Sequence, residues 1–139
     1  MIKELVKDEE FLQLPAEPAT ADDADVAQDL RDTMASLKDG CACLAANQIG
    51  SRKAVIAFES KGGIAVMFNP RIKQAIIPYQ ATESCLSLGR ETDVVRHKRI
   101  IVGYDELVDG KLVSRQKKFG DFTAEAIQHA IDHCAGKLV

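Results

Sequence analysis

No stretch of this 139-residue chain approaches the roughly 20 consecutive apolar residues that are needed to cross a membrane. The first ten residues also lack the apolar segment that defines a secretory signal peptide. With 21 acidic and 18 basic side chains, the formal net charge is −3, which argues against electrostatic binding to nucleic acid or a membrane surface. We therefore expect a cytoplasmic protein whose partners are neither nucleic acids nor membranes.

Internal repeats, linkers and low-complexity tracts are also missing. A chain of this length supports one hydrophobic core, so we expect a single domain over residues 1–139, and a monomer. Its four cysteines could form two disulfides, but in the cytoplasm they should stay reduced. Cys41, Cys43 and Cys134 are interpreted as core thiols, with a redox or metal-binding role left open for the first two.

Turn signals separate the predicted strands, which cover residues 53–58, 64–68, 71–77, 100–104 and 111–119. Asn69 and Pro70 should interrupt the chain between the second and third of these strands. Asp109 and Gly110 should form the tight turn of a hairpin between the last two. Together with two helices, this order of elements predicts an α+β fold with mainly antiparallel sheets around a C-terminal metal-binding helix.

The two predicted helices follow from apolar residues that recur every three or four positions. The first should cover residues 22–38, before Gly40. The second should begin with Asp121 as its N-cap and end at Gly136, which would adopt the left-handed conformation. Its buried face should consist of Phe122, Ala126, Ile127, Ala130, Ile131 and Cys134.

Two histidines four residues apart lie in this second helix. Side chains at this spacing leave one face of a helix a turn apart, so the imidazoles of His129 and His133 can bind one cation. Taken alone, the pair would equally fit helix residues with no metal. In the H-E-x-x-H motif of metallohydrolases, a glutamate follows the first histidine and acts as the general base, but this chain has Ala130 there.

A third ligand would have to come from upstream, because the six residues after His133 contain Cys134 but no carboxylate side chain. Cys85 is the best candidate. A thiolate with two imidazoles suits Zn²⁺ or Fe²⁺ and leaves a fourth position open for water. Glu83 would either hydrogen-bond a group behind the ligands or pair with an arginine, and the sequence does not decide which.

Three segments, in order, resemble the three motifs of peptide deformylases, which remove the N-terminal formyl group from nascent polypeptides. Residues 40–48 resemble a glycine-containing motif ending in L-A-A-x-Q, residues 83–87 resemble E-G-C-L-S, and residues 128–133 resemble Q-H-E-x-x-H. The spacing suits the family, and the resemblance covers nearly the whole chain. It implies the deformylase fold and a hydrolase that acts on N-formylmethionyl peptides or nascent chains.

The resemblance also implies roles for individual residues. Cys85, His129 and His133 would be the metal ligands, with Fe²⁺ as the usual physiological ion and Zn²⁺, Ni²⁺ or Co²⁺ as substitutes. The side-chain amide of Gln48 and the backbone N–H of Leu86 would stabilise the oxyanion that forms at the formyl carbon. This division of roles between the metal ligands and the two hydrogen-bond donors makes physical sense. A metal activates water, while fixed donors stabilise charge that develops only in the transition state.

Other positions concern the substrate, and three of them depart from the family pattern. Arg96 matches a position that lines the substrate cleft. Cys43 and Ser84 stand where the family has glycines, and with Cys41 they are expected to border the substrate. Ala130 replaces the glutamate that should carry a proton from water to the departing amine. Such acid–base groups contribute about 10²–10⁴-fold to a rate, so we expect weakened activity.

Two functions follow from this combination of matches and departures. The first is a peptide deformylase whose activity is weakened at Ala130. The second is a non-catalytic member of the family, which would bind a metal, and formyl-peptides with it, without turnover. The sequence does not tell whether Ala130 is natural or engineered.

Overall fold

The computed structural model describes residues 1–37, 41–85 and 87–139. Its helices are α1 (Glu9–Leu12), α2 (Ala24–Ser36) and α3 (Asp121–Cys134), and two short 3₁₀ helices cover Ala21–Asp23 and Ala46–Ile49. Its strands are β1 (Cys43–Ala45), β2 (Val55–Ser60), β3 (Gly63–Cys85), β4 (Arg90–Val108) and β5 (Lys111–Gly120). These elements confirm the predicted α+β class.

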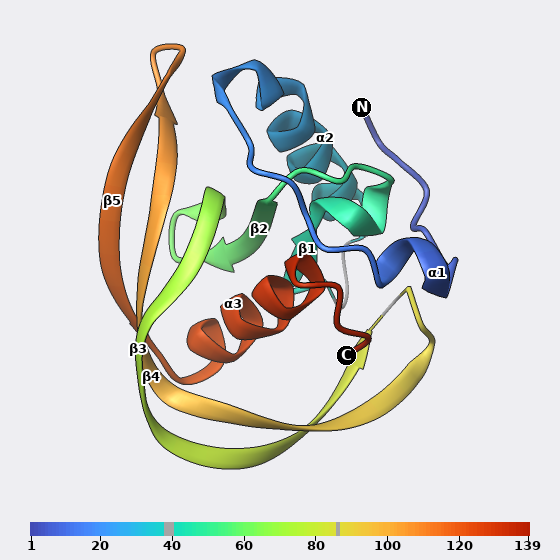
Figure 1. Ribbon diagram of the computed structural model, residues 1–139, viewed down its shortest axis with the longest axis vertical. Helices are drawn as coiled ribbons and strands as arrows, with labels where there is room; N and C mark the ends of the chain where they lie inside the picture. Colours follow the sequence, from blue (N-terminus) through green and yellow to red (C-terminus); the bar gives the residue numbers. More distant parts are fainter. Residues whose placement is uncertain (38–40, 86) are drawn as a thin grey trace.

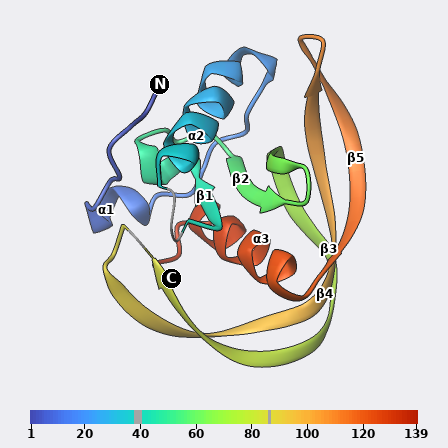
Figure 2. The ribbon, with the colours of Figure 1, turned by 180° about the vertical axis from the view of Figure 1, so that it is seen from behind.

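Each strand pairs with its neighbour in the sequence, so the sheet has the order β1-β2-β3-β4-β5 and every pair is antiparallel. β3 and β4 are 23 and 19 residues long and form a strongly curved hairpin that passes around α3 (Figure 1). The view from behind shows α3 inside this curve (Figure 2). The curve returns Cys85, the last residue of β3, to the side of α3.

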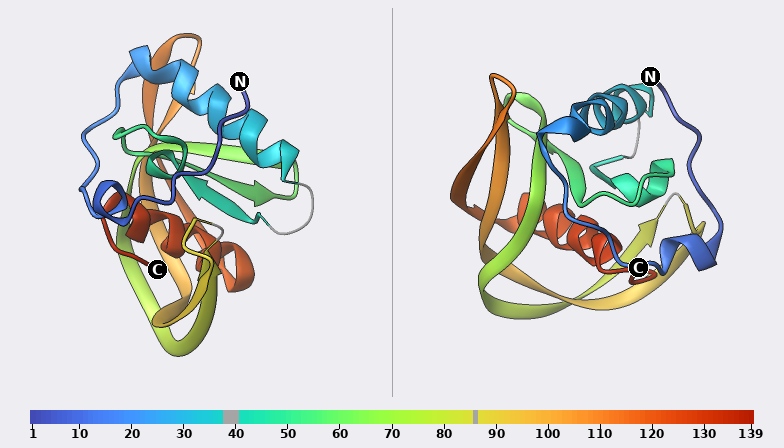
Figure 3. Two further views of the ribbon diagram at one scale, coloured as in Figure 1. Left: turned by 90° about the vertical axis from the view of Figure 1, so that its right-hand side faces the viewer. Right: turned by 45° about the horizontal axis from the view of Figure 1, so that its top comes forward.

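The helices α2 and α3 lie on opposite sides of β1 and β2, as the side view shows (Figure 3). Alternate strand residues face the two helices, which is the period of two that a strand covered on both faces requires. Leu44, Val55 and Ala57 pack in the cluster on the α2 side. The cluster on the α3 side, here called the inner cluster, consists of Ala45, Ile56, Phe58, Met67, Ile100, Val102, Tyr104, Ala124, Ile127 and Ala130.

The predicted break at Asn69 and Pro70 is wrong, because β3 continues through both residues. Asn69 has a φ of 52°, and the pairing of β3 with β4 shifts its register here. The Asn69 side chain accepts a hydrogen bond from the Ala19 backbone N–H at 2.8 Å and donates to Asp105 at 3.1 Å. The strand therefore bulges and is held by side-chain contacts that bind it to distant segments.

Residues 78–85 of β3 and 90–99 of β4, the far half of the hairpin, were not among the predicted strands. Most of its side chains are exposed or half-buried, so they show no apolar alternation for a sequence pattern to detect. The predicted turn at Asp109 and Gly110 is confirmed, with φ angles of 48° and 78°. Such angles are those of the tight turns that join antiparallel strands.

The two helices were located correctly, but their ends differ from the prediction. The first one is an α-helix from Ala24 to Ser36, because a 3₁₀ turn capped by Thr20 precedes it. The prediction for Lys38 and Gly40 lies outside the described residues. None of the helices in the described part of the chain is long and apolar enough to cross a membrane.

In α3, Asp121 is the first helical residue and Gly120 takes the N-cap position without a side-chain cap, so the predicted Asp121 cap is wrong. Phe122 was expected on the buried face but is 63% exposed, because it lies in the first turn beside an open cavity. Gly136 ends the helix with a φ of 81°, as predicted. A side chain there would clash with the backbone oxygen of Gln13, so the position requires glycine.

Candidate metal centre and its cavity

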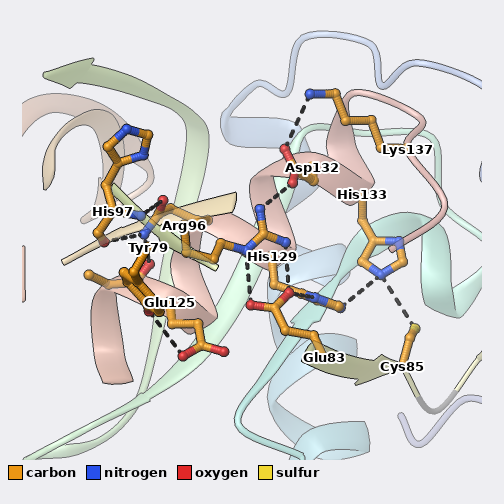
Figure 4. Close-up of polar contacts among 12 residues, drawn as sticks. Tyr79, Glu83, Cys85, Arg96, His97, Glu125, His129, Asp132, His133 and Lys137 are labelled. Atoms are coloured by element: carbon orange, nitrogen blue, oxygen red, sulfur yellow. Dashed lines mark hydrogen bonds and ion pairs between the residues drawn. The ribbon is translucent and has the colours of Figure 1, made fainter. Parts of the chain in front are cut away.

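The fold brings together Cys85, from the end of β3, with His129 and His133 from successive turns of α3 (Figure 4). Their ligand atoms all lie within 4.8 Å of one another. The Nε2 atom of His133 is 3.2 Å from Nε2 of His129 and 3.4 Å from Sγ of Cys85. Three groups separated by up to 48 residues in the sequence thus converge on one point.

This donor set fits a divalent transition metal. One sulfur and two imidazole nitrogens are ligands that Zn²⁺ and Fe²⁺ accept, and three protein ligands leave a fourth position for water or substrate. All three side chains are buried. In the described residues, Nδ1 of His133 has no hydrogen-bond partner, so the orientation of this ring depends on its packing and on the contacts of its Nε2 atom.

The ring of His129 is oriented by a carboxylate behind it. Its Nδ1 donates a hydrogen bond to Oε1 of Glu83 at 2.8 Å, which leaves Nε2 facing the other two ligands. Arg96 binds both oxygens of Glu83, with Nη2 at 2.7 Å from Oε1 and Nε at 2.9 Å from Oε2. The same guanidinium reaches Asp132 of α3 at 2.5 Å. Glu83 therefore pairs with an arginine, one of the two alternatives that the sequence left open, and also hydrogen-bonds the candidate ligand His129.

These contacts shift the pKa values of the buried groups in a consistent way. Burial raises the pKa of the Cys85 thiol, but hydrogen bonds from His129 and His133 outweigh it and lower the value to about 5. Burial lowers the pKa of His129, whereas Cys85 and Glu83 raise it to about 9. Burial raises the pKa of Glu83, and the hydrogen bonds from His129 and Arg96 bring it down to about 2. A thiolate, the form that binds metals, is thus favoured at Cys85.

Gln48 faces the same point from the 3₁₀ helix Ala46–Ile49. Its Oε1 accepts the backbone N–H of Ala45 at 2.9 Å, which fixes the orientation of the amide. Its Nε2 then lies 3.4 Å from Sγ of Cys85 and 3.2 Å from Oγ of Ser87. The amide N–H₂ group is therefore presented toward the candidate ligands, as an oxyanion donor would have to be.

A cavity of about 260 Å³ opens beside the ligands. The predicted site residues Cys41, Cys43 and Ser84 line it, together with Gln48, Cys85 and His129. It is also lined by Ala42, Leu44, Thr82, Glu83, Phe122, Glu125 and Ala126. Burial raises the pKa of Cys43 and raises that of Cys41 to about 11, so both are neutral thiols at physiological pH.

Two predicted site residues, Arg96 and Ala130, do not line this cavity, and a third is not described. Leu86 lies outside the described residues, so its backbone N–H stays a prediction. Arg96 does not line this cavity; it is buried behind His129 with its guanidinium bound to two carboxylates. Its expected position in the wall of the substrate cleft stays a prediction. Ala130 is fully buried in the inner cluster.

Two residues at or beside the cavity were not predicted as site residues from the sequence. Glu125 lines the cavity, and Tyr79 donates a hydrogen bond to its Oε1 at 3.1 Å. The spacing of four residues between Glu125 and His129 was a signal that could have placed Glu125 on the ligand face of the helix. No such signal existed for Tyr79, because it reaches the site only through the curvature of β3.

Comparison with known proteins gives consistent matches. A profile of the polypeptide deformylase family matches residues 2–139. The peptide deformylase of Clostridium beijerinckii is 39% identical over 139 residues, which cover 100% of both chains. The peptide deformylase of Thermoanaerobacter pseudethanolicus is 32% identical over 134 residues, covering 94% of this chain and 81% of that protein.

Solved structures agree with these sequence matches. A peptide deformylase from Legionella pneumophila has a TM-score of 0.85 and 29% identity, covering 99% of this chain and 83% of its own. The class I type b peptide deformylase from Acinetobacter baumannii with bound Met-Ala-Ser has a TM-score of 0.85 and 25% identity, covering 99% of this chain and 97% of its own.

Proposed function

Because the chain belongs to the polypeptide deformylase family, we propose that it removes the N-terminal formyl group from formylmethionyl peptides. The observation that carries this proposal is the convergence of Cys85, His129 and His133, the first two of which line a cavity of about 260 Å³. Nascent chains in the cytoplasm would supply such formylated ends, and the chain would act as a single-domain monomer.

We propose Fe²⁺ as the physiological metal, with Zn²⁺, Ni²⁺ or Co²⁺ as substitutes, held by Cys85, His129 and His133. When bound, the metal would lower the pKa of water and polarise the formyl carbonyl. Glu83 would keep Nδ1 of His129 protonated, so that Nε2 remains the ligand atom. Arg96 would hold Glu83 in place and balance its charge.

Gln48 would donate a hydrogen bond to the oxyanion that develops when water attacks the formyl carbon. Its support is the fixed orientation of the amide, whose oxygen is engaged by Ala45 and whose nitrogen faces Cys85. The backbone N–H of Leu86 would be the second donor. Cys41, Cys43 and Ser84 would border the peptide backbone, since all three line the cavity.

The glutamate that would carry protons from water to the departing amine is absent, because Ala130 takes its position. Ala130 has no group that can accept a proton from water or return one to the amine, so we propose that turnover is about 10²–10⁴-fold slower than with a glutamate.

The second function, metal and peptide binding without turnover, is favoured by one observation. Ala130 lies within the inner cluster, against which Cys43 also packs, so apolar side chains fill this region.

Release of formate from formyl-Met-Ala distinguishes the two functions. The protein should be prepared without oxygen and loaded with iron, and Cys85→Ser serves as the control that loses the candidate thiolate. Slow formate release that disappears in Cys85→Ser is the expected result. A metal-loaded protein that binds the peptide but releases no formate would replace the enzymatic proposal with the non-catalytic one.

A further inference from the structure

The side chain of Gln128 is bound to backbone groups alone, and it has no part in the proposed reaction. Its Oε1 accepts the backbone N–H of His97 at 2.9 Å. Its Nε2 donates to the backbone oxygen of His97 at 2.8 Å and to that of Ala124 at 2.9 Å. Gln128 is buried, so water competes little for these contacts. One side chain of α3 thus binds both polar backbone groups of a single residue of β4.

This contact continues the sheet past the end of β5. The last pair between β4 and β5 joins Arg99 to Gly120, after which the chain turns into α3. Alternate residues of an antiparallel strand direct their backbone groups to the same edge, so His97 requires the next partner on this side of β4. The amide of Gln128 is that partner, since it offers one acceptor and one donor as a peptide unit does. α3 is therefore attached to β4 at a fixed point along the strand.

The attachment lies directly beside the network that orients the candidate ligands. Gln128 immediately precedes the ligand His129, and His97 immediately follows Arg96. On its other edge, β4 pairs Arg96 with Tyr79 of β3. The backbone around Arg96 is thus held by β3 on one side and by α3 on the other.

Arg96 can bind its two carboxylates only if β4 keeps this position along α3. Its side chain is 4% exposed and lies between Glu83 of β3 and Asp132 of α3 (Figure 4). Successive side chains of a strand point to opposite faces, so a shift of β4 by one residue would withdraw the guanidinium from Asp132. The Glu83 oxygen that Arg96 binds is the one that accepts the Nδ1 hydrogen bond of His129. A shift of β4 would therefore reach the ligand ring through Arg96 and Glu83.

We propose that Gln128 is a positioning residue of the candidate metal centre, which fixes β4 on α3 so that Arg96 can hold Glu83 behind His129. This inference rests on the ligand set of the proposed function, but it does not require turnover. A residue that only anchored the helix would contribute to stability and leave the metal centre unchanged. A positioning residue would alter the metal centre of the folded protein.

The test replaces Gln128 with methionine, which has a similar length but no donor and only a weak acceptor. Competition with a chelator on the folded, Zn²⁺-loaded protein should give a Kd for Zn²⁺ about tenfold higher in Gln128→Met. Gln128→Glu keeps an acceptor for the His97 N–H and loses the donor, so its Kd should rise less. The matched control is Thr33→Val on α2, which removes a hydrogen bond that Thr33 accepts from the Lys3 backbone at 2.9 Å. Its Kd should equal that of the parent.

Two spectroscopic measurements separate positioning from a loss of stability. In the NMR spectrum of the Zn²⁺-loaded parent, the Nδ1 proton of His129 should give a slowly exchanging signal, because Glu83 binds it in a buried site. This signal should exchange faster in Gln128→Met and stay unchanged in Thr33→Val. With Co²⁺ in place of Zn²⁺, the thiolate-to-cobalt absorption band should shift in Gln128→Met alone.

An unchanged Kd in folded Gln128→Met and Gln128→Glu overturns the proposal, and so does an equal rise in Thr33→Val. A higher Kd with an unchanged His129 signal also overturns it, because Gln128 would then act by another route. A parent protein that binds no Zn²⁺ counts against it as well. Formate release from formyl-Met-Ala is measured separately, so metal binding that depends on Gln128 without any formate release would contradict only the proposed function.

Discussion

Nδ1 of His129 donates a hydrogen bond to Oε1 of Glu83 at 2.8 Å, and the opposite nitrogen of the same ring faces His133. Glu83 is in turn held by two hydrogen bonds from Arg96, which also binds Asp132 (Figure 4). The chain of contacts links β3, β4 and α3 behind the candidate metal ligands. Loss of any of these contacts would leave the His129 ring freer to turn away from the candidate metal site.

We predict that the protein binds one divalent transition metal per chain through Cys85, His129 and His133. Cys85→Ser and His133→Ala should each lower the bound metal to a small fraction of one equivalent, because two remaining ligands hold these ions weakly. Elemental analysis of purified variants measures this, with Glu106→Gln as a matched surface control. Full metal content in both variants would show that the ligands are elsewhere.

Glu83→Gln should weaken metal binding without removing a ligand. The carboxylate now accepts three hydrogen bonds, one from His129 and two from Arg96. The glutamine keeps one acceptor oxygen and turns an NH₂ group toward one of these donors, so the imidazole is held less firmly. We expect metal affinity to fall by about 10–100-fold. Competition with a chelator gives the affinity, and an unchanged value in a folded variant would reduce Glu83 to a structural partner of Arg96.

Gln48→Leu should lower turnover of any active form by about 10²–10³-fold through loss of the oxyanion donor. Metal content should stay the same, because Gln48 is not a ligand. The variant also loses the hydrogen bond to Ala45, which is worth about 1 kcal/mol of stability. Thermal melting followed by circular dichroism separates the two effects, and an unchanged rate would leave Gln48 with the structural role alone.

Ala130→Glu should raise deformylase activity by about two orders of magnitude or more, because it supplies the missing proton carrier. Helix propensity does not oppose the change, since glutamate is a good helix former. The position is fully buried, so the variant should also be less stable than the parent protein. Formate release from formyl-Met-Ala gives the rate, and the bound metal is measured in the same preparation.

A folded, metal-loaded Ala130→Glu protein without a gain in rate would contradict this expectation. The cause would then lie with the side chains at Cys43 and Ser84, where the family pattern has glycines. The double variant Ala130→Glu with Cys43→Gly tests the part played by Cys43, because it restores two of the three departures and leaves Ser84 unchanged. Recovery in the double variant alone would show that Cys43 obstructs the cleft.

The chemistry of the candidate site could be predicted from the sequence where it depends on local spacing. His129 and His133 are one helical turn apart in any helix, and Asp109-Gly110 favours a tight turn in any hairpin, so both features follow from a few adjacent residues. Cys85 was found because few residues of its type are available and because its surroundings resemble a family motif. The α+β class followed from the order of the elements.

Only the tertiary structure decided which distant groups meet. The partners of Glu83, the burial of Arg96 and the contact of Tyr79 with Glu125 all depend on the curvature of the long hairpin, which wraps β3 and β4 around α3. Curvature of this kind comes from bulges and from packing against the helix, and such long-range effects leave no local periodicity in the sequence. The types of the site residues could therefore be identified from the sequence, whereas which side chains contact one another depended on the folded structure.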